Sequence, residues 1–426
     1  MALSYGRAAE RVRPHRSGQP AEFAVMAGLT LLPGRGLTEK VAVVVREGLV
    51  AEIRAAGSRR KLPALVLDRP ASTLLPGLID SHIHLSFSAG PDPVADLVGA
   101  SDVSVGMRSA RNAQVALASG ITTVADCGAR GGVVLELRDA VANGLITGPR
   151  ILACGAPITT TAGHCAWLGG CADSAEEVLR TARRQVAAGA DFLKVMMTGG
   201  NLTPGSNPFM LQFPPPVIEM LAAEARRLGR PLVAHAHSQE AIAAAAAAGV
   251  SIVAHATCQS ADGIGITEAT LKALVKAQTV VDPTITVGTP PPGDDAAWSA
   301  GSERARIRAE MLPVFAAMAD VGVPLLAGSD AGVTNVPHDS AARAVLALHT
   351  DVGLTLTAAI EAGTAVAARA LGLTAITGSI APGLAADLAL YDADLRQEPS
   401  SLLRPARVWL GGRLVAADGS LILSAN

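Results

Sequence analysis

The sequence has few aromatic residues, little excess charge and no paired cysteines. Phe, Trp and Tyr make up 3% of its 426 residues, which argues against a base-stacking surface for nucleic acid. Lys and Arg number 35 and Asp and Glu number 37, so the formal net charge of −2 does not favour nucleic acid or an anionic membrane as a partner. The five cysteines form no CxxC motif, which argues against a disulfide scaffold and favours a reducing cytoplasm.

A long apolar segment is also missing. The most apolar stretch, residues 241–254, is dominated by Ala and is shorter than the roughly 20 residues of a membrane-spanning helix. The first 20 residues carry four Arg and no apolar core, unlike a secretory signal, and we expect residues 1–20 to be a disordered leader. Hydrophobic residues still make up 50% of the chain, which is enough for a large core. We therefore expect a cytoplasmic protein without a membrane partner.

The middle of the chain alternates short apolar runs with helical segments. The helical segments are clearest at residues 217–228 and 238–248, where Ala, Leu, Glu and Arg recur at helical spacing. The apolar runs suit buried parallel strands, and there are eight of them: 78–83, 121–125, 151–154, 192–197, 232–236, 252–256, 280–285 and 325–328. Eight units predict an α/β protein with a TIM-type (β/α)₈ barrel over residues 76–375, although a doubly wound sheet remains the alternative.

Both ends of the chain have the alternating pattern of short strands. Apolar and polar residues alternate within residues 21–75, with Gly and charged residues between the candidate strands, and the last fifty residues look the same. Two β-rich ends around a different middle predict one small β-sandwich domain formed by residues 21–75 and 376–426.

Two polar positions in the first half of the barrel region stand out. In His82-Ile83-His84 the two imidazoles point to the same side of a strand and can approach one cation, although two unrelated surface histidines would look alike. Lys194 lies within the apolar run DFLKVMM, where burial disfavours an ammonium. This lysine either pairs with a carboxylate or, as a neutral amine, adds CO₂ to form a carbamate that can bridge two cations.

More polar residues end later strands. His235 and His237 lie in VAHAHS, His255 in IVAHA and Asp330 in LLAGSD. Asp330 by itself is equally well explained as a helix N-cap. Five of the nine histidines nevertheless fall at expected strand ends, where a parallel barrel carries its active site, and chance scatter rarely produces this pattern.

The other four histidines have less context. His164 lies in TAGH within a long irregular segment, where it is either an ordinary loop residue or a contact to a substrate. His15, His338 and His349 follow no expected strand, and we predict that they are structural or solvent-exposed.

Five elements in order resemble the metal-dependent amidohydrolase superfamily: PGLIDSHIHL, DFLKVMMTGG, VAHAHS, IVAHA and GSDAG. The branch that looks most similar is the imidazolonepropionase-like one, with its Xaa-Pro dipeptidases, and amide hydrolases of the ochratoxin, carbamate and phenylurea types are similar. The likeness spans residues 21–418, and GSIAPGLAADLALYDAD resembles the closing β-sandwich strands of the family. All five elements in order are far more specific than any one alone.

The resemblance implies a centre of two divalent metal ions, with zinc as the expected metal. His82 and His84 would hold the first ion, and His235 and His255 the second. Lys194, carboxylated by CO₂, would bridge both ions.

The resemblance also implies catalytic and substrate-binding roles. Asp330 would bind the first ion and act as general base and then general acid for the hydroxide that bridges the ions and attacks the amide carbonyl. His164 and His237 would contact substrate and assist catalysis at the oxyanion. The segment TAGH carries Ala162 where the branch has a second Gly.

The implied activity is hydrolysis of an amide bond in a small molecule, such as a dipeptide or an N-acyl amino acid. Hydrolysis of a carbamate, a phenylurea or a cyclic amide by the same centre is an alternative. A non-catalytic relative used for binding or assembly is a second alternative, disfavoured because all six expected ligands are present. The absence of GxSxG argues against a serine hydrolase, and a homo-oligomer is expected.

Two Pro-rich segments are candidates for a wall over the site. Residues 201–216 carry Phe209, Met210 and Phe213, and residues 288–301 carry Trp298. They predict either an apolar lid that favours a hydrophobic substrate group or a contact between subunits.

Overall fold

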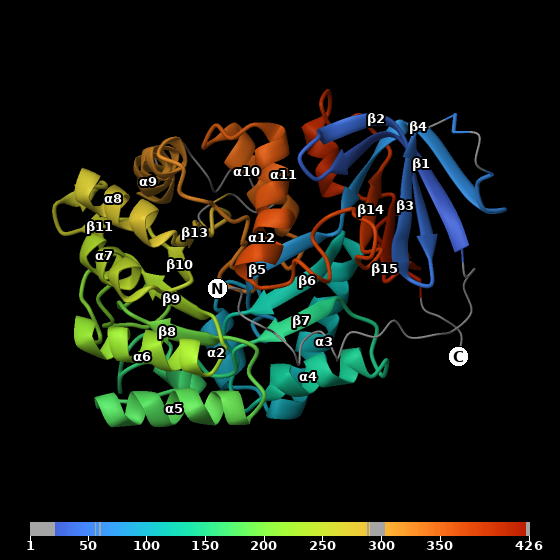
Figure 1. Cartoon of the computed structure of the whole chain (residues 1–426). Coiled ribbons are helices and arrows are strands. Elements are labelled where there is room, and N and C mark those ends of the chain that lie inside the picture. Colours follow the sequence, from blue (N-terminus) through green and yellow to red (C-terminus); the bar gives the residue numbers. More distant parts are fainter. Residues whose placement is uncertain (1–21, 56, 59–60, 288, 290–302, 423–426) are drawn as a thin grey trace.

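The computed structural model describes residues 22–55, 57–58, 61–287, 289 and 303–422. The expected disordered leader, residues 1–20, lies outside this part of the chain. In Figure 1 the helices surround a set of parallel strands, and a large sheet formed by both ends of the chain lies to one side.

Both ends of the chain contribute to one eight-stranded sheet. Its strand order is β17-β16-β15-β14-β4-β1-β2-β3. The strands are β1 (Glu22–Leu32), β2 (Gly36–Arg46), β3 (Leu49–Ala55), β4 (Val66–Pro76), β14 (Leu388–Tyr391), β15 (Arg407–Leu410), β16 (Arg413–Ala417) and β17 (Ser420–Leu421). The expected joining of the two ends is thus present as one continuous sheet, and the two facing sheets of a sandwich stay a prediction.

The junction between the two ends is β4, which pairs with β14. Leu74 of β4 lies opposite Leu390 of β14, and both side chains are fully buried. Further out, the rings of Phe23 and Trp409 stack with their centroids 6.0 Å apart. Apolar side chains from the first and last strands therefore share one core.

Parallel strands form two further sheets. One has the order β5-β6-β7 and the other β13-β10-β9-β8. These strands are β5 (Leu78–Ile83), β6 (Ile121–Asp126), β7 (Arg150–Ala153), β8 (Leu193–Met196), β9 (Leu232–Ala236), β10 (Ile252–His255) and β13 (Val280–Asp282), and a small hairpin joins β11 (Gln259–Ser260) to β12 (Gly263–Ile264). Seven of the eight predicted barrel strands are confirmed, and their observed ends agree with the predicted ends to within a few residues.

The eighth predicted strand, residues 325–328, is not a strand. Leu325 makes only a single parallel bridge to Val281. Ala331, further along the same segment, makes a single bridge to Ile83 of β5, and Ile158, which follows β7, makes one to Val195 of β8. The mixed α/β class is confirmed, and closure into a complete barrel stays a prediction.

Helices follow most of the parallel strands and lie outside them in Figure 1. Local sequence explains their ends: Ser174 and Glu177 form a capping box at the start of α5, and α7 runs from the capping Ser238 to the left-handed Gly249. The helices are α2 (Pro93–Val98), α3 (Asp102–Ala118), α4 (Val133–Ala142), α5 (Ala175–Ala187), α6 (Pro215–Arg227), α7 (Gln239–Ala248), α8 (Glu268–Ala277), α9 (Glu303–Asp320), α10 (Ala341–Thr350), α11 (Leu356–Ala362) and α12 (Ala365–Ala370), with 3₁₀ turns at Ala166–Leu168 and Pro399–Leu403.

A buried ion pair ties the parallel strands to the eight-stranded sheet. Arg150 begins β7, and its Nη1 lies 2.8 Å from Oδ2 of Asp387, the residue before β14. Asp387 is 2% exposed and also accepts hydrogen bonds from the hydroxyl of Thr377 and the backbone N–H of Gly411. Three segments from different parts of the chain therefore meet at one carboxylate.

We predict that Asp387→Asn lowers the free energy of unfolding by about 3 kcal/mol, because it leaves the Arg150 guanidinium buried without its counter-charge. Urea unfolding followed by circular dichroism measures the change. The matched control is Asp394→Asn, which breaks the more exposed pair with Arg396 and should cost less than about 1 kcal/mol. Equal effects of the two substitutions would contradict the pinning role.

Candidate metal centre

The strand-end residues singled out from the sequence lie together in the structure. His82 lies in β5 and His84 just after it, Lys194 in β8, His235 in β9 and His255 at the end of β10. His237 follows β9, and Asp330 follows the bridge at Leu325. All seven side chains are buried, and none is more than 8% exposed. Their predicted roles as ligands remain predictions, but the structure brings every one of them into a single cluster.

Asp330 lies beside the two histidines of the HIH motif. Its Oδ1 is 3.2 Å from Nε2 of His84 and 3.5 Å from Nε2 of His82. Nζ of Lys194 is also 3.5 Å from Nε2 of His82. The amine, the carboxylate and two imidazoles therefore surround one small volume.

The histidines of β9 and β10 form the other half of the cluster. Ring centroids lie 4.5 Å apart for His235 and His255 and 5.3 Å apart for His82 and His255. His237 lies 4.6 Å from His235 by the same measure. Two groups have ligand atoms within 4.8 Å of one another: one is His82, His255 and Asp330, and the other is His235, His237 and His255. His237, expected only near substrate, is thus also in reach of a cation.

Protein acceptors or hydroxyls contact the outward nitrogen of four rings. Nε2 of His235 lies 2.9 Å from the carbonyl of Gly199, and Nδ1 of His84 lies 3.3 Å from the carbonyl of Gly128. Two threonine hydroxyls lie 2.9 Å from Nδ1 of His237 and of His255: Thr257 and Thr284 respectively. Such contacts fix ring orientation and direct the other nitrogen towards the cluster, as metal-binding histidines require.

The protonation states suit a cation. Burial lowers the pKa of His82, His235 and His255 well below the ordinary value for histidine, so these imidazoles are neutral. Burial raises the pKa of Asp330, but the adjacent His84 and His255 outweigh it and lower that pKa overall. Neutral imidazoles around an ionised carboxylate are a donor set for zinc and similar ions.

A buried oxygen in the cluster lacks a hydrogen bond. Oδ1 of Asp330 is close to His84, but the ring N–H does not point at it, and Oδ1 accepts no hydrogen bond from any described residue. A buried acceptor without a hydrogen bond costs about 1–3 kcal/mol of folding free energy. A cation between Asp330 and the imidazoles would compensate this oxygen, so the residues present fit a metal centre.

Strained backbone is concentrated at the same place. Asp330 (φ +56°), His255 (φ +67°), Ala256 (φ +46°) and Thr284 (φ +46°) all adopt the left-handed region without being glycine. Each such residue costs of the order of 1–3 kcal/mol and persists only where its surroundings hold it. Two of the four are predicted ligands, so the chain maintains this geometry at the expense of stability.

Two buried carboxylates that sequence reasoning missed support the cluster from below. Asp80 accepts hydrogen bonds from the backbone N–H groups of His82 (3.1 Å) and Ser329 (3.0 Å). Asp282 accepts one from the Ser81 hydroxyl (2.6 Å). Burial raises the pKa of Asp80 to about 7 and that of Asp282 to about 6. Asp80 lies within PGLIDSH and Asp282 ends an apolar run, as Asp330 does, so the sequence places both carboxylates on barrel strands but does not reveal their hydrogen-bond partners.

His164 lies next to the cluster, as the resemblance implied. Its ring centroid is 4.6 Å from that of His235, its side chain is 4% exposed, and its Nδ1 has no hydrogen-bond partner among the described residues. Gln212 accepts a hydrogen bond from the His164 backbone N–H (2.6 Å). A Cβ on Gly200 would come within 2.6 Å of the ring, so only glycine leaves room for it. Ala162 has φ +57° and so takes the left-handed conformation that glycine adopts more readily.

The first of the two predicted lid segments packs beside His164. The Thr203 hydroxyl accepts hydrogen bonds from the Cys165 N–H (2.9 Å) and the Trp167 indole (3.4 Å). Phe213 is buried in the core, whereas Phe209 and Met210 are exposed. The segment therefore stays a candidate wall, with Phe213 removed from it. The second segment, with Trp298, lies almost wholly outside the described residues.

The sequence predicts structural or solvent-exposed positions for the remaining three histidines, and the structure describes two of them. His338, predicted to be structural or exposed, is buried at 4% exposure, and its Nε2 lies 3.1 Å from the carbonyl oxygen of His84. His349 is half-buried beside the carbonyl of Leu354 (2.8 Å), and His15 lies outside the described residues. His338 had no strand-end context, and its partner is distant in sequence.

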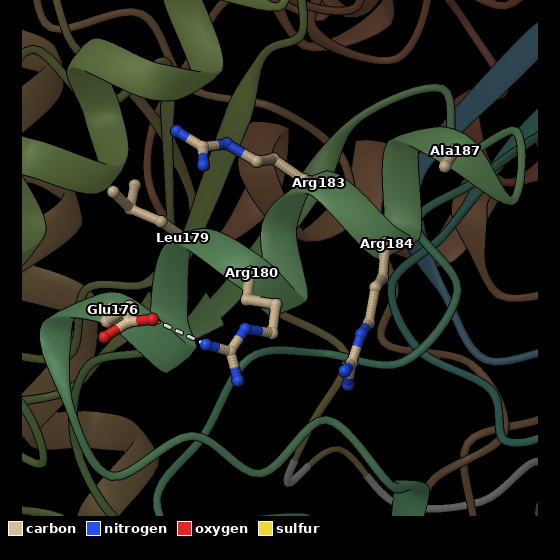
Figure 2. A pocket seen from close by; sticks show the side chains of 6 residues that line it. All are labelled: Glu176, Leu179, Arg180, Arg183, Arg184 and Ala187. Atoms are coloured by element: carbon tan, nitrogen blue, oxygen red, sulfur yellow. Dashed lines mark hydrogen bonds and ion pairs between the residues drawn. The ribbon is translucent and has the colours of Figure 1, made fainter.

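A hollow on the molecular surface lies on an outer helix. Its volume is about 370 Å³, and it is lined by side chains of α5, among which Arg180 pairs with Glu176 at 2.5 Å (Figure 2). Arg183, another lining residue, pairs with Glu224 of α6 (2.7 Å). None of its lining residues is a candidate ligand.

Among the described helices, none has the length and apolar character needed to cross a bilayer.

Comparison with known proteins gives a consistent result. The profile of the amidohydrolase family matches residues 73–415. The chain is 28% identical to ochratoxinase of Aspergillus niger over 93% of this chain and 87% of that protein, and 28% identical to imidazolonepropionase of Mesorhizobium japonicum over 89% and 93%. A solved Xaa-Pro dipeptidase with bound methionine superposes with a TM-score of 0.82 at 24% identity, covering 92% of this chain and 99% of the other, which shows likeness of fold.

We predict that His164 makes the stability of the metal-free protein depend on pH. Burial lowers the pKa of His164 to about 3 from an ordinary value of 6.5, so the unfolded chain binds the proton first and stability falls as pH drops from 6.5 towards 3. Between pH 7 and pH 5 the wild type should lose about 2 kcal/mol more than His164→Gln. Urea unfolding at both pH values measures this difference. Equal losses in the two proteins would show that His164 is not neutral and buried as described.

Proposed function

Because the chain belongs to the amidohydrolase family, we propose that it is a metal-dependent hydrolase that cleaves an amide bond of a small molecule at the strand-end cluster. Hydrolysis of a carbon–nitrogen bond follows from the family. The observation that carries the metal-dependent part is the convergence of four imidazoles, Lys194 and Asp330 in one buried cluster. A non-catalytic binding protein would not need all six.

Two divalent ions, zinc being the metal we expect, would polarise the amide carbonyl and lower the pKa of the attacking water. His82, His84 and Asp330 would hold one of them. His235 and His255 would hold the other, with His237 close enough to assist. The neutral imidazoles, and the Oδ1 of Asp330 that accepts no hydrogen bond from the described residues, support this assignment of ligands to two ions.

Lys194 is the proposed bridge between the two halves of the cluster. It is 2% exposed, and no carboxylate in the described part of the chain lies within 4.0 Å of its Nζ. Lys194 therefore makes no direct ion pair with an acid among the described residues. A neutral amine here can attack CO₂, forming a nitrogen–carbon bond and releasing one proton, which yields a carbamate anion with two oxygens.

Three side chains are proposed to act on substrate. Asp330, ionised and facing the cluster, would take the proton of the attacking water and return it to the leaving nitrogen. His237 presents the nitrogen that Thr257 does not contact, and His164 has a free buried Nδ1 beside His235. We propose that both donate to the developing oxyanion or contact the substrate.

The substrate proposed first is a dipeptide or an N-acyl amino acid. The names of the ochratoxinase and of the Xaa-Pro dipeptidase support an amide of this kind. Carbamate, phenylurea and cyclic-amide bonds form the second candidate class, because solved structures named molinate hydrolase and phenylurea hydrolase B share the fold with TM-scores of 0.78 and 0.76. The imidazolonepropionase name adds a cyclic amide to that class.

The finer architecture is part of the same proposal. We propose a closed (β/α)₈ barrel over residues 76–375, supported by the bridges of Leu325 and Ala331 to β13 and β5 and by the bridge of Ile158 to β8. We propose a β-sandwich for residues 21–75 and 376–426, supported by their shared core. A homo-oligomeric state and a cytoplasmic location rest on the sequence expectation alone.

We predict that Lys194→Ala lowers kcat/KM by more than about 100-fold, because loss of a bridging ligand should cost more than loss of an outer partner of a ligand, which costs about 10–100-fold. The lost bridging carbamate should be partly replaced when acetate or propionate is added, and the metal content should fall from two ions per chain. Metal analysis and a hydrolysis assay measure both effects. Lys276→Ala, which removes an exposed lysine of α8, is the control and should behave as wild type.

Two outcomes would contradict the bridge. One is a Lys194→Ala protein with substantial activity in the absence of added acids. The other is a folded wild-type protein that binds no divalent ion after dialysis against zinc, which would also remove the metal-dependent function.

We predict that purified, zinc-loaded protein hydrolyses dipeptides or N-acyl amino acids faster than carbamates, phenylureas or cyclic amides. Release of amine is measured for one compound of each class at equal concentration. Asp330→Asn should lower the turnover of every active compound by about 10²–10⁴-fold, because proton transfer is lost with the carboxylate. Turnover confined to the second group would move the assignment to that class.

A further inference from the structure

The segments that carry His84 and Asp330 run side by side. The Asp330 N–H donates to the His82 carbonyl and the His84 N–H to the Ala331 carbonyl, each at 2.7 Å. After the turn that follows His84 the two segments meet again: the Ala89 N–H donates to the Gly332 carbonyl (2.9 Å) and the Asn335 N–H to the Gly90 carbonyl (3.3 Å). Between these contacts, the carbonyl oxygen of His84 accepts no backbone N–H of the Asp330 segment among the described residues.

A side chain continues this contact. Nε2 of His338 lies 3.1 Å from the carbonyl oxygen of His84. The same oxygen accepts a hydrogen bond from the Phe87 N–H (3.2 Å), but that bond only closes the local turn. The imidazole of His338 is thus the group that joins the His84 carbonyl to the segment of Asp330.

The surroundings are shaped for this ring. His338 is 4% exposed. A Cβ on Gly332 would lie 2.3 Å from the His84 carbonyl oxygen and 3.2 Å from Nε2 of His338, and Gly332 has φ +104°. Only glycine at this position leaves the carbonyl and the imidazole room to meet.

The turn after His84 is held on its other side by α3. The side-chain amide of Asn112 donates to the carbonyls of Leu85 and Phe87, both at 2.9 Å. The ring of His84 stacks on that of Phe87 with centroids 4.6 Å apart. Its own contact with the Gly128 carbonyl is long, at 3.3 Å, so the ring depends on where this turn holds its backbone.

We infer that His338 is a positioning residue for the metal centre: it holds the backbone of His84 against the segment of Asp330, and so sets the spacing of two ligands to the same ion. The inference rests on the proposed function and adds a residue outside the ligand set. His338 contacts no reacting atom, and it acts through the carbonyl oxygen of His84.

The test compares three substitutions at His338 in the full chain. Gln places an amide N–H near the position of Nε2, Asn carries the same amide one carbon shorter, and Leu cannot donate at all. Zn²⁺ affinity is measured by chelator competition, and Co²⁺ absorption spectra report the geometry of the bound ions. Calorimetry of the metal-free proteins reports folding separately.

The expected result is a graded loss at one ion. His338→Leu should weaken binding of the ion held by His82, His84 and Asp330 by about 10–100-fold and alter its Co²⁺ spectrum. Binding of the ion held by His235 and His255 should stay within a few-fold. His338→Gln should remain close to wild type, and His338→Asn should resemble Leu. If Leu fails to fold, the contrast of Gln with Asn decides.

His349→Leu is the matched control, because it removes a histidine of α10 that contacts the backbone carbonyl of Leu354. It should lower the melting temperature of the metal-free protein and leave both ion affinities unchanged. The inference is overturned if His338→Leu binds both ions as wild type does, or if Gln and Leu lose affinity equally. Failure of the wild type to bind any divalent ion would instead overturn the proposed function, and the inference with it.

Discussion

Withdrawal of ionisable side chains from water at the strand ends is the constraint on which the rest of this structure depends. Six imidazoles, an amine and a carboxylate lie buried within contact distance of one another, and each would be costly there without a partner. Carbonyls and threonine hydroxyls contact four of the rings from outside. The inward atoms face one another, and a positive ion is the natural group to satisfy them together.

The supporting residues fit this constraint. Asp80 and Asp282 hold the backbone beneath the cluster. Position 328 requires glycine, because a Cβ there would lie 2.1 Å from the Asp282 carboxylate. Left-handed backbone at Asp330 and His255 aims both side chains inward at a cost in stability. Such strain is retained where a site requires it, which is why the buried carboxylates and the strained residues lie together.

Much of the fold was predictable because its information is local. Buried parallel strands are continuous apolar runs, so residues 78–83 and 232–236 were found with their observed ends. Alternation along a strand also placed His82 and His84 on one side. Residues 325–328 failed as a strand because an apolar run does not reveal how many ladder bonds its neighbours offer, and only Leu325 finds a partner in the adjacent strand.

The missing parts of the site are those whose reason lies far away in the chain. His338 has no local pattern, and its meaning comes from the carbonyl of His84. Asp282 gave the same sequence pattern as Asp330, yet it accepts hydrogen bonds from Ser81 and Thr284 beneath the cluster. A strand-end carboxylate can serve a cation or a serine hydroxyl, and only tertiary contacts separate the two.

The pairing of β4 with β14 has a consequence for biogenesis. Leu74 finds Leu390 only after nearly the whole polypeptide has left the ribosome, so the N-terminal strands emerge with an unpaired edge. Contacts so distant in sequence form slowly, and an open edge invites association with other nascent chains. Premature termination near the last strands would therefore leave the sheet open through its middle, and such fragments should be substrates for chaperones and proteases.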